Sequence, residues 1–452
     1  MNQKQAITEA GTLDPNFGLD GVVGWPIKGL TGNYPESLLE LANGKLLVAE
    51  IPSHAGSAVL RRLNTDGTLD EAFGNGGSVE IRFEIGDQFS IPVLNSHPAG
   101  GWVLTGQLVR LIDGTFYGFE VFVRQFEDGT VDPDFGDKGI LYVDTQKLVD
   151  PGKQVPAAVL DKRFQDPTPP EQQTANAGSA ARSCAVLLDG KIVLIDEVFD
   201  SDLAMRGIVV RLNTNGSLDT SFNSKGFTLI ELDRNKHEYE GVQALVVQGD
   251  GKVLVTGTYK PLEAPETQGV YVTRYLENGQ LDSRFATQGI ATISLTSDVG
   301  LSWVGAIALR KDDGAITVAG NLSREGKRRG WVAVLNESGT VNLVFNDGKT
   351  LYSDMLPEGV NWKHCEWPTP DALLVSGSGG GAFVNENSSI LIARYLARGA
   401  PDALFNKQGW ATYRTGSPTM SDCVVLKNQR IIVCGRASRP VDHKGYVLCY
   451  HG

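Results

Sequence analysis

The chain has 452 residues, of which 41% are hydrophobic and 21% are charged, and its formal net charge is −12. This composition is typical of a globular protein, and the acidic balance disfavours binders of nucleic acid and of anionic membranes, because both need a basic surface. No run of apolar residues is long enough for a secretory signal or a membrane span, so we expect a cytoplasmic protein and leave signal-independent export open.

The earliest element in the chain is one copy of a repeat. An eleven-residue phrase, Gly-x-apolar-Asp-x-x-Phe-x-x-x-Gly, starts at Gly11 and occurs seven times; we call it the repeat motif. Consecutive copies lie 56 to 87 residues apart. Self-similarity at such a period predicts a repeat architecture. The aromatic residues of the seven copies are Phe17, Phe73, Phe135, Phe222, Phe285, Phe345 and Phe405.

Each repeat contains four apolar, β-branched runs. In the clearest repeat, Gln243–Gln248 and Lys252–Thr258 are joined by Asp250-Gly251, which is a strong hairpin signal. Val270–Leu276 and Ile290–Leu295 follow on either side of the repeat motif. Four antiparallel strands repeated seven times predict an all-β fold, a seven-bladed β-propeller with four-stranded antiparallel blades.

The two ends of the chain predict how the ring closes. The chain starts just before a repeat motif and its strand Val22–Ile27, and it stops after the strand Tyr446–His451. The N-terminal strand is then the missing fourth strand of the C-terminal blade, and pairing the two removes two open sheet edges.

We therefore expect a single domain over residues 1–452. An insertion, 145–182, separates the second and third blades and is either a cover over one face or a loose excursion. The predicted blades are 37–83, 91–144, 183–232, 243–295, 305–354, 362–414, and 421–450 together with 22–27.

The repeat motif has a structural explanation. Its Asp is suited to capping a tight turn through a side-chain oxygen, and its Phe to filling the gap between sheets. One carboxylate per turn is too few for calcium, which needs six to eight oxygens. The sixth copy has Asn342 in place of Asp, and Asn makes the same turn. We expect no metal and no cofactor.

The phrase GTLDEAFGNGG (Gly67–Gly77), together with the hairpin GDGKVLVTG (Gly249–Gly257), resembles the delta-60 repeat family of bacterial proteins. The resemblance covers nearly the whole chain. It implies a seven-bladed propeller, and it implies no activity, because that family has no common catalytic residues to carry over.

Function is expected on one face of the ring. The turns within the hairpins and the repeat motifs share one face, whereas the loops that differ between blades share the other, the variable face. The innermost strand of each blade lines the central channel, so residues at its variable-face end are the candidates for ligand binding. They are Glu36, Arg182, Trp303, Asn361, Trp362, His364 and Asp422.

Each candidate also has a plainer interpretation. The two Trp side chains are suited to stacking on a planar ligand or a sugar, or to packing between blades. The carboxylates of Glu36 and Asp422, together with Arg182, form either an acid–base set or a solvated channel mouth. The basic segment Asn321–Gly330 is suited to an acidic partner or a phosphate, or is a solvated charge run. The five Cys lie at small apolar strand positions and predict buried, reduced thiols.

Two functions stay open. The absence of any catalytic motif favours a non-enzymatic binding protein that uses the variable face and channel mouth for a small molecule, glycan or protein. The alternative is an enzyme of hydrolase or lyase type, with Glu36, Asp422, His364 and Arg182 around the channel. The propeller fold alone does not indicate an enzymatic activity.

Overall fold

The computed structural model describes residues 9–51, 56–152, 183–200, 204–233, 236–263, 268–295, 301–324, 327–380, 387–439 and 443–452. The candidate Arg182 and most of the predicted insertion, residues 153–182, lie outside this part of the chain. The described start of the insertion forms the short helix α1 (Thr145–Val149).

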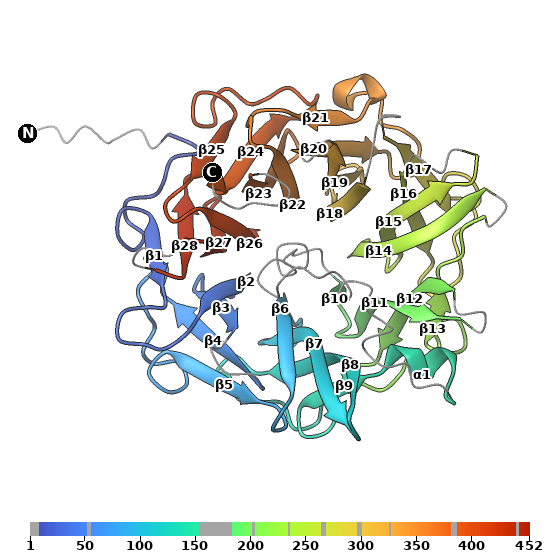
Figure 1. Cartoon of the computed structure of the whole chain (residues 1–452), viewed down its shortest axis with the longest axis horizontal. Helices are drawn as coiled ribbons and strands as arrows, with labels where there is room; N and C mark the ends of the chain where they lie inside the picture. The colour runs from blue at the N-terminus through green and yellow to red at the C-terminus, as the bar shows by residue number, and fades with distance from the viewer. Residues whose placement is uncertain are drawn as a thin grey trace, which may run out of the picture.

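The described residues form seven four-stranded antiparallel sheets arranged in a ring (Figure 1). The predicted seven-bladed propeller is therefore confirmed. Blade 1 is β2 (Tyr34–Glu40), β3 (Leu46–Ile51), β4 (Ser57–Leu63) and β5 (Ser78–Arg82). Blade 2 is β6 (Gln88–Ser96), β7 (Trp102–Ile112), β8 (Thr115–Gln125) and β9 (Ile140–Val143). Blade 3 is β10 (Cys184–Val186), β11 (Ile192–Phe199), β12 (Met205–Leu212) and β13 (Phe227–Leu229). Blade 4 is β14 (His237–Val247), β15 (Val253–Pro261), β16 (Gly269–Tyr275) and β17 (Ile290–Ser294).

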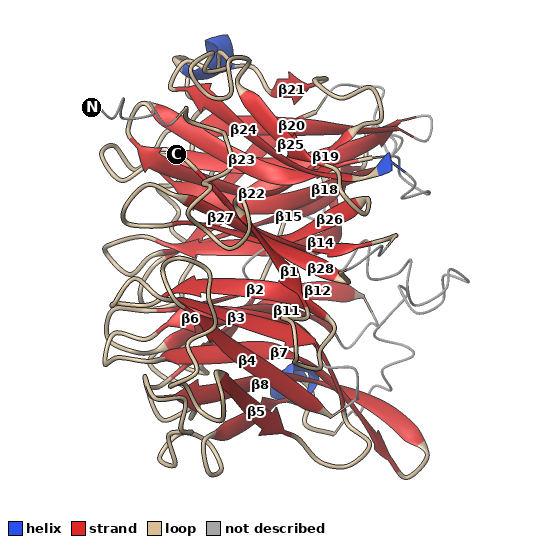
Figure 2. Cartoon of the chain, turned by 90° about the vertical axis from the view of Figure 1, so that its left-hand side faces the viewer, coloured by secondary structure: helices blue, strands red, loops and turns tan. Residues whose placement is uncertain are grey.

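The remaining three blades complete the ring. Blade 5 is β18 (Leu301–Leu309), β19 (Ile316–Arg324), β20 (Lys327–Leu335) and β21 (Leu351–Ser353), and the 3₁₀ turn η2 (Phe345–Gly348) precedes β21. Blade 6 is β22 (Val360–Thr369), β23 (Ala372–Gly379), β24 (Ser389–Leu396) and β25 (Trp410–Tyr413). Blade 7 is β26 (Pro418–Val425), β27 (Ile431–Ala437), β28 (Gly445–Tyr450) and β1 (Val22–Trp25). In the side view the strands run between the two faces of the ring (Figure 2).

Ring closure follows the prediction from the chain ends. β1 pairs antiparallel with β28, in the register Val22↔Leu448 to Trp25↔Gly445. The first repeat motif adds to the contact between the N-terminal and C-terminal segments, because the N–H of Gly11 donates to the carbonyl of His451 at 2.7 Å. The N-terminal strand therefore serves as the outer strand of the last blade.

The innermost strands share a backbone irregularity. In β2 the pairing shifts between Pro35 and Ser37, and the corresponding strands of blades 2, 4, 5, 6 and 7 shift at the same level. A β-bulge of this kind adds a residue that has no partner in the ladder and that bends the strand. In three neighbouring blades, 6, 7 and 1, the extra residues are Lys363, Ser421 and Glu36.

The repeat motif builds the contacts between blades. Its Phe is buried in all seven copies, with at most 2% of the residue exposed. Phe73 of the second copy lies 6.0 Å from the Trp102 ring of the next blade, centroid to centroid. The Asp forms the predicted turn; for example, the Ser221 N–H donates to Asp219 Oδ1 at 3.1 Å. The motif is therefore a packing and turn device.

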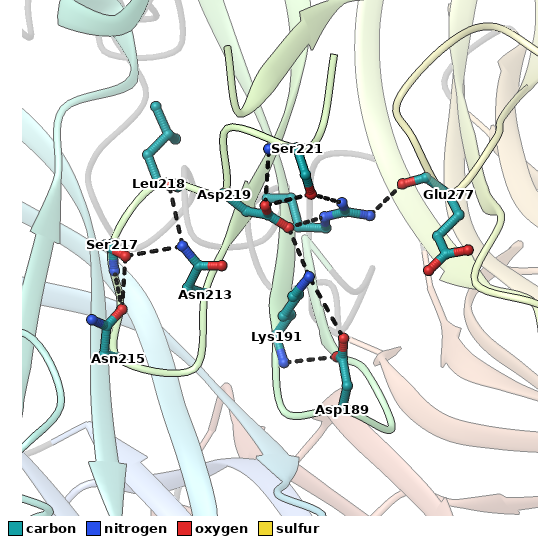
Figure 3. A network of polar contacts seen from close by, with 10 residues as sticks. Asp189, Lys191, Asn213, Asn215, Ser217, Leu218, Asp219, Ser221 and Glu277 are labelled. Atoms are coloured by element: carbon teal, nitrogen blue, oxygen red, sulfur yellow. Dashed lines mark hydrogen bonds and ion pairs between the residues drawn. The ribbon is translucent and has the colours of Figure 1, made fainter. Parts of the chain in front are cut away.

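The Asp of the motif also forms an ion pair with an Arg eight residues earlier. In four blades the Arg Nε–carboxylate distance is 2.6–2.9 Å. The pairs are Arg62–Asp70, Arg211–Asp219, Arg274–Asp282 and Arg394–Asp402. Arg274 also reaches the next blade, where its Nη1 donates to the Glu337 carbonyl at 2.7 Å. Figure 3 shows the surroundings of Asp219, including Lys191 and Ser221.

The sixth copy of the motif, in blade 5, lacks both charges. Val334 stands at the Arg position and Asn342 at the Asp position, and the Asn342 N–H still donates to the Val334 carbonyl at 3.1 Å. The Asn342 amide instead donates to Asn336 Oδ1 at 2.9 Å. A neutral pair thus replaces the ion pair as a unit.

The five Cys are buried and form no disulfides, as predicted. Burial raises the pKa of the Cys365 and Cys423 thiols well above the ordinary value, so these thiols stay protonated. Among the described residues, none of the helices has the length and apolar character needed to cross a membrane.

Candidate functional site: a charged cluster at the channel mouth

Ionisable and aromatic side chains from blades 5, 6, 7 and 1 gather near the variable-face ends of the innermost strands, which surround the centre of the ring in Figure 1. The set sits on and beside the bulges, where the backbone departs from the regular ladder. We call it the channel cluster, and its members are Tyr34, Glu36, Trp303, Arg328, Lys363, Ser421 and Arg436.

Lys363 forms the floor of the cluster. It is the bulge residue of β22, it is only 4% exposed, and its Nζ donates to the Met420 carbonyl of β26 at 3.0 Å. Burial lowers the pKa of its ammonium to about 7, the negative charge of Glu36 opposes this shift, and the charges of Arg436 and Arg328 add to it. Lys363 is therefore poised to gain or lose a proton near neutral pH.

Glu36 lies across the seam between blades 7 and 1. It is the bulge residue of β2 and is half-buried. Burial raises the pKa of its carboxyl, although Arg436 and Lys363 pull the pKa down and the Ser421 hydroxyl donates a hydrogen bond to it. A raised carboxyl pKa beside a lowered ammonium pKa brings the two groups toward the same pH range.

Two half-buried Arg side chains flank the floor, each beside an aromatic ring. The Arg436 guanidinium carbon lies 6.0 Å from the Tyr34 ring centroid, and that of Arg328 lies 6.0 Å from the Trp303 ring centroid. Such positions are at the outer limit of a cation–π contact. Burial lowers the pKa of Arg328, and it raises the pKa of Tyr34. Arg328 remains charged, since a guanidinium does not titrate near neutral pH.

Two buried polar atoms next to the cluster have no hydrogen-bond partner among the described residues. They are Thr419 Oγ1 and Asn321 Oδ1, on residues 9% and 5% exposed. Thr419 pairs in register with Arg436, and Asn321 with Trp303. A buried polar atom without a partner costs free energy, so these atoms mark places where a ligand or water completes the structure.

The predicted site residues separate into two groups. Glu36 and Trp303 belong to the channel cluster, where Trp303 stays half-buried. Asp422 is buried and accepts hydrogen bonds from the Leu38 N–H at 2.8 Å and the Ser37 hydroxyl at 3.0 Å, so it ties blade 7 to blade 1. Its charge also raises the pKa of Glu36.

Of the other predicted residues, Trp362 and Asn361 contact the neighbouring blade 5, whereas His364 faces a residue of its own strand. Trp362 is fully buried, and its indole N–H donates to Ser353 Oγ at 3.0 Å. Asn361 Oδ1 accepts from the Asn321 amide at 2.6 Å. His364 is 9% exposed, and its Nε2 lies 3.6 Å from the Glu366 carboxylate. These contacts describe blade packing, and a ligand role for the three residues stays a prediction.

Sequence reasoning missed Lys363, Ser421 and Arg436. Lys363 stands between two predicted residues, and a Lys inside an apolar strand is a signal that was available. Arg328 lies in the basic segment Asn321–Gly330. The structure continues β19 and β20 into this segment, and this brings Arg328 toward the channel.

The described residues contain no group of three or more His, Cys, Asp or Glu side chains suited to a metal ion. Deeper in the channel, the innermost strands of blades 1, 2, 3 and 7 enclose a cavity of about 150 Å³. Its lining combines apolar residues such as Leu38 and Leu94 with the polar residues Asn95, Ser96 and Asp422. The ionisable groups whose pKa values are shifted toward neutral pH lie in the channel cluster.

Comparison with known proteins adds to this description. Residues 41–73 and 188–222 match the family described as a domain of unknown function (DUF5122) beta-propeller. This match agrees with the observed propeller, while the delta-60 name stays a prediction. No curated protein matches the chain.

Several solved structures are similar to the chain at low sequence identity. One is the α-L-arabinofuranosidase Arb93A from Fusarium graminearum, with 8% identity, a TM-score of 0.39, and coverage of 98% of this chain and 97% of that chain. Another is Sqt1 from Chaetomium thermophilum, with 12% identity, a TM-score of 0.46, and coverage of 93% and 97%. A third is the polysaccharide lyase Uly1, with 11% identity, a TM-score of 0.46, and coverage of 94% and 93%. Similarity at this level carries no argument about activity.

Proposed function

We propose that this protein is a non-enzymatic binding protein whose ligand, a small molecule, enters the channel mouth at the variable face. The observation that supports this proposal is the channel cluster, in which a half-buried rim surrounds a buried, charged floor. Ligand sites in general combine a concave, partly apolar setting with a few fixed polar groups. The bulges supply such groups on a rigid frame of three neighbouring blades.

The proposal is tested by a thermal-shift screen with a library of small metabolites. A ligand that binds only the folded state raises the melting temperature. We expect a hit to stabilise the wild type and the Trp410→Ala control, but not Trp303→Ala. Both Trp are half-buried, and Trp410 lies on β25, the outermost strand of its blade. A hit that stabilises Trp303→Ala equally, or a screen without hits, contradicts the proposal; glycans and proteins are then the next candidates.

A second candidate is an enzyme of hydrolase or lyase type. The observation that favours it is the opposite displacement of two pKa values, raised for Glu36 and lowered for Lys363, since such pairs are suited to general acid–base catalysis near neutral pH. Incubation of a bound ligand with the protein, followed by mass spectrometry, separates the two functions. Product formation that is lost in Lys363→Met while binding persists favours the enzyme; an unchanged ligand favours the binding protein. The cytoplasmic location stays a prediction, which cell fractionation tests.

A further inference from the structure

The channel cluster brings together cations from three successive blades. Arg328 comes from blade 5, Lys363 from blade 6 and Arg436 from blade 7. Both guanidinium groups lie close enough to Lys363 to affect its charge. Three like charges at this spacing repel one another, and the repulsion grows as water is excluded. This gathering is unexpected in a protein with a net charge of −12.

Two carboxylates face these cations, but one of them is directed elsewhere. Asp422 uses Oδ2 to accept from the Leu38 N–H and the Ser37 hydroxyl, and Oδ1 to accept from the Cys423 N–H at 2.8 Å. Among the described residues, Glu36 is therefore the carboxylate that chiefly balances the three cations. These five groups together carry one net positive charge when all of them are ionised.

The rim adds apolar surface and polar atoms without partners. Trp303 is half-buried beside Arg328, so one part of its ring stays accessible. Thr419 Oγ1 lies beside Arg436 in register and has no hydrogen-bond partner among the described residues. A hydroxyl donates to an anion as readily as to water, and an aromatic ring packs against a planar ligand or a sugar face.

We infer that the ligand of this site is a small anion, a carboxylate attached to a ring, whose charge lies among Arg328, Lys363 and Arg436 and whose ring packs against Trp303. This inference rests on the proposed binding function and names the ligand class for the same site. Arginine is well suited to it, because a guanidinium donates two parallel hydrogen bonds to one carboxylate. Glu36 acts as the internal counter-ion that the incoming carboxylate competes with.

The inference is tested with two pairs of matched probes, benzoate with benzamide and glucuronate with glucose. Isothermal titration calorimetry is expected to show at least about tenfold tighter binding of the charged member of a pair, and weaker binding at high salt. Arg436→Gln and Arg328→Gln are each expected to weaken that binding roughly tenfold. The matched control is Arg329→Gln, since Arg329 is the neighbour of Arg328 in β20 and pairs with Asp354 instead.

A gain of affinity provides the sharpest test. Glu36→Gln removes the competing carboxylate at nearly constant volume, so it is expected to tighten binding of the charged probe roughly tenfold. Circular dichroism checks that each variant is folded. If Glu36→Gln does not fold, the binding measured with Arg436→Gln decides the test. Weaker binding by Glu36→Gln, or equal binding of the neutral probes, overturns the anion inference and leaves the binding function in place. No binding by either pair overturns the ring-carboxylate inference, whereas the failure of the wider metabolite screen overturns the binding function as well.

Discussion

The ion pair inside the repeat motif can be exchanged for the neutral pair that blade 5 already contains. In blade 3, Arg211 and Asp219 are 4% and 6% exposed at their side chains and lie 2.7 Å apart. The matching residues of blade 5 are Val334 and Asn342. Blade 3 is a suitable host for this exchange, because its ion pair is buried and Asn213 stands where Asn336 accepts from Asn342. We therefore predict that Arg211→Val with Asp219→Asn costs less than the sum of the two single changes.

The size of the expected loss in the free energy of unfolding follows from the burial of the ion pair. Removing one partner of a buried ion pair costs about 3–5 kcal/mol, because the other charge is left without compensation. Arg211→Val leaves Asp219 with the partly exposed Lys191 at 3.1 Å, so we place its cost at the low end, about 3 kcal/mol. Asp219→Asn leaves Arg211 with the Ser221 hydroxyl and the Glu277 carbonyl, and we expect about 2–3 kcal/mol.

The double variant is expected to lose only about 2–3 kcal/mol, against about 5–6 kcal/mol for the two single losses added together, which gives a coupling energy of about 2–4 kcal/mol in a double-mutant cycle. Equilibrium urea unfolding, followed by tryptophan fluorescence, measures the four free energies. The coupling is also expected to depend on pH. Burial alone raises the pKa of Asp219, but the hydrogen bonds from Ser221 and Lys191 and the charge of Arg211 outweigh it and lower that pKa.

A carboxylate with a lowered pKa stabilises the fold above its ordinary pKa, near 4, and loses this effect as the pH falls through its folded value. The coupling energy is therefore constant around neutral pH and declines only in acid. Losses that simply add in the double variant, or a single Asp219→Asn change without cost, refute the reasoning.

Three further predictions follow from the seams and the channel. Asp422→Asn is expected to cost about 2 kcal/mol in urea unfolding, because an amide group then faces the Leu38 N–H; an unchanged midpoint contradicts this role. Deletion of residues 1–27 removes β1 and exposes the edge of β28, so we expect self-association in analytical ultracentrifugation, whereas deletion of residues 1–8 is the control that keeps β1. The affinity for benzoate is expected to rise as the pH falls through about 7, because a bound anion favours protonated Lys363; Lys363→Met removes this dependence, and a flat wild-type profile contradicts it.

The fold could be predicted because its signals are local and repeated. Turn residues such as Asp250-Gly251 and the spacing of the Phe residues are read directly from the sequence, and the ring closure follows from counting strands. The ion pairs could have been found too, since an Arg precedes the motif Asp by eight residues in most copies and disappears together with it in the sixth.

The channel cluster could be predicted only in part. Glu36 and Trp303 were identified from their position at the ends of strands. Lys363 was not identified, because the alternation of inward and outward side chains along a regular strand does not single it out. Only the bulge in β22 gives its side chain an environment different from those of its neighbours. A bulge depends on contacts with the next blade, which the sequence of one strand does not contain. Arg436 reaches the cluster from a second strand, and its partner Tyr34 lies at the other end of the chain.

The pairing of β1 with β28 has a consequence for synthesis. During translation, Val22–Trp25 leaves the ribosome long before its partner strand, Gly445–Tyr450. The N-terminal strand must therefore wait with both of its edges unpaired while six complete sheets form behind it. Until the final hairpin arrives, the growing protein exposes strand edges that other nascent chains can bind, and we expect this interval to be the one in which molecular chaperones matter most.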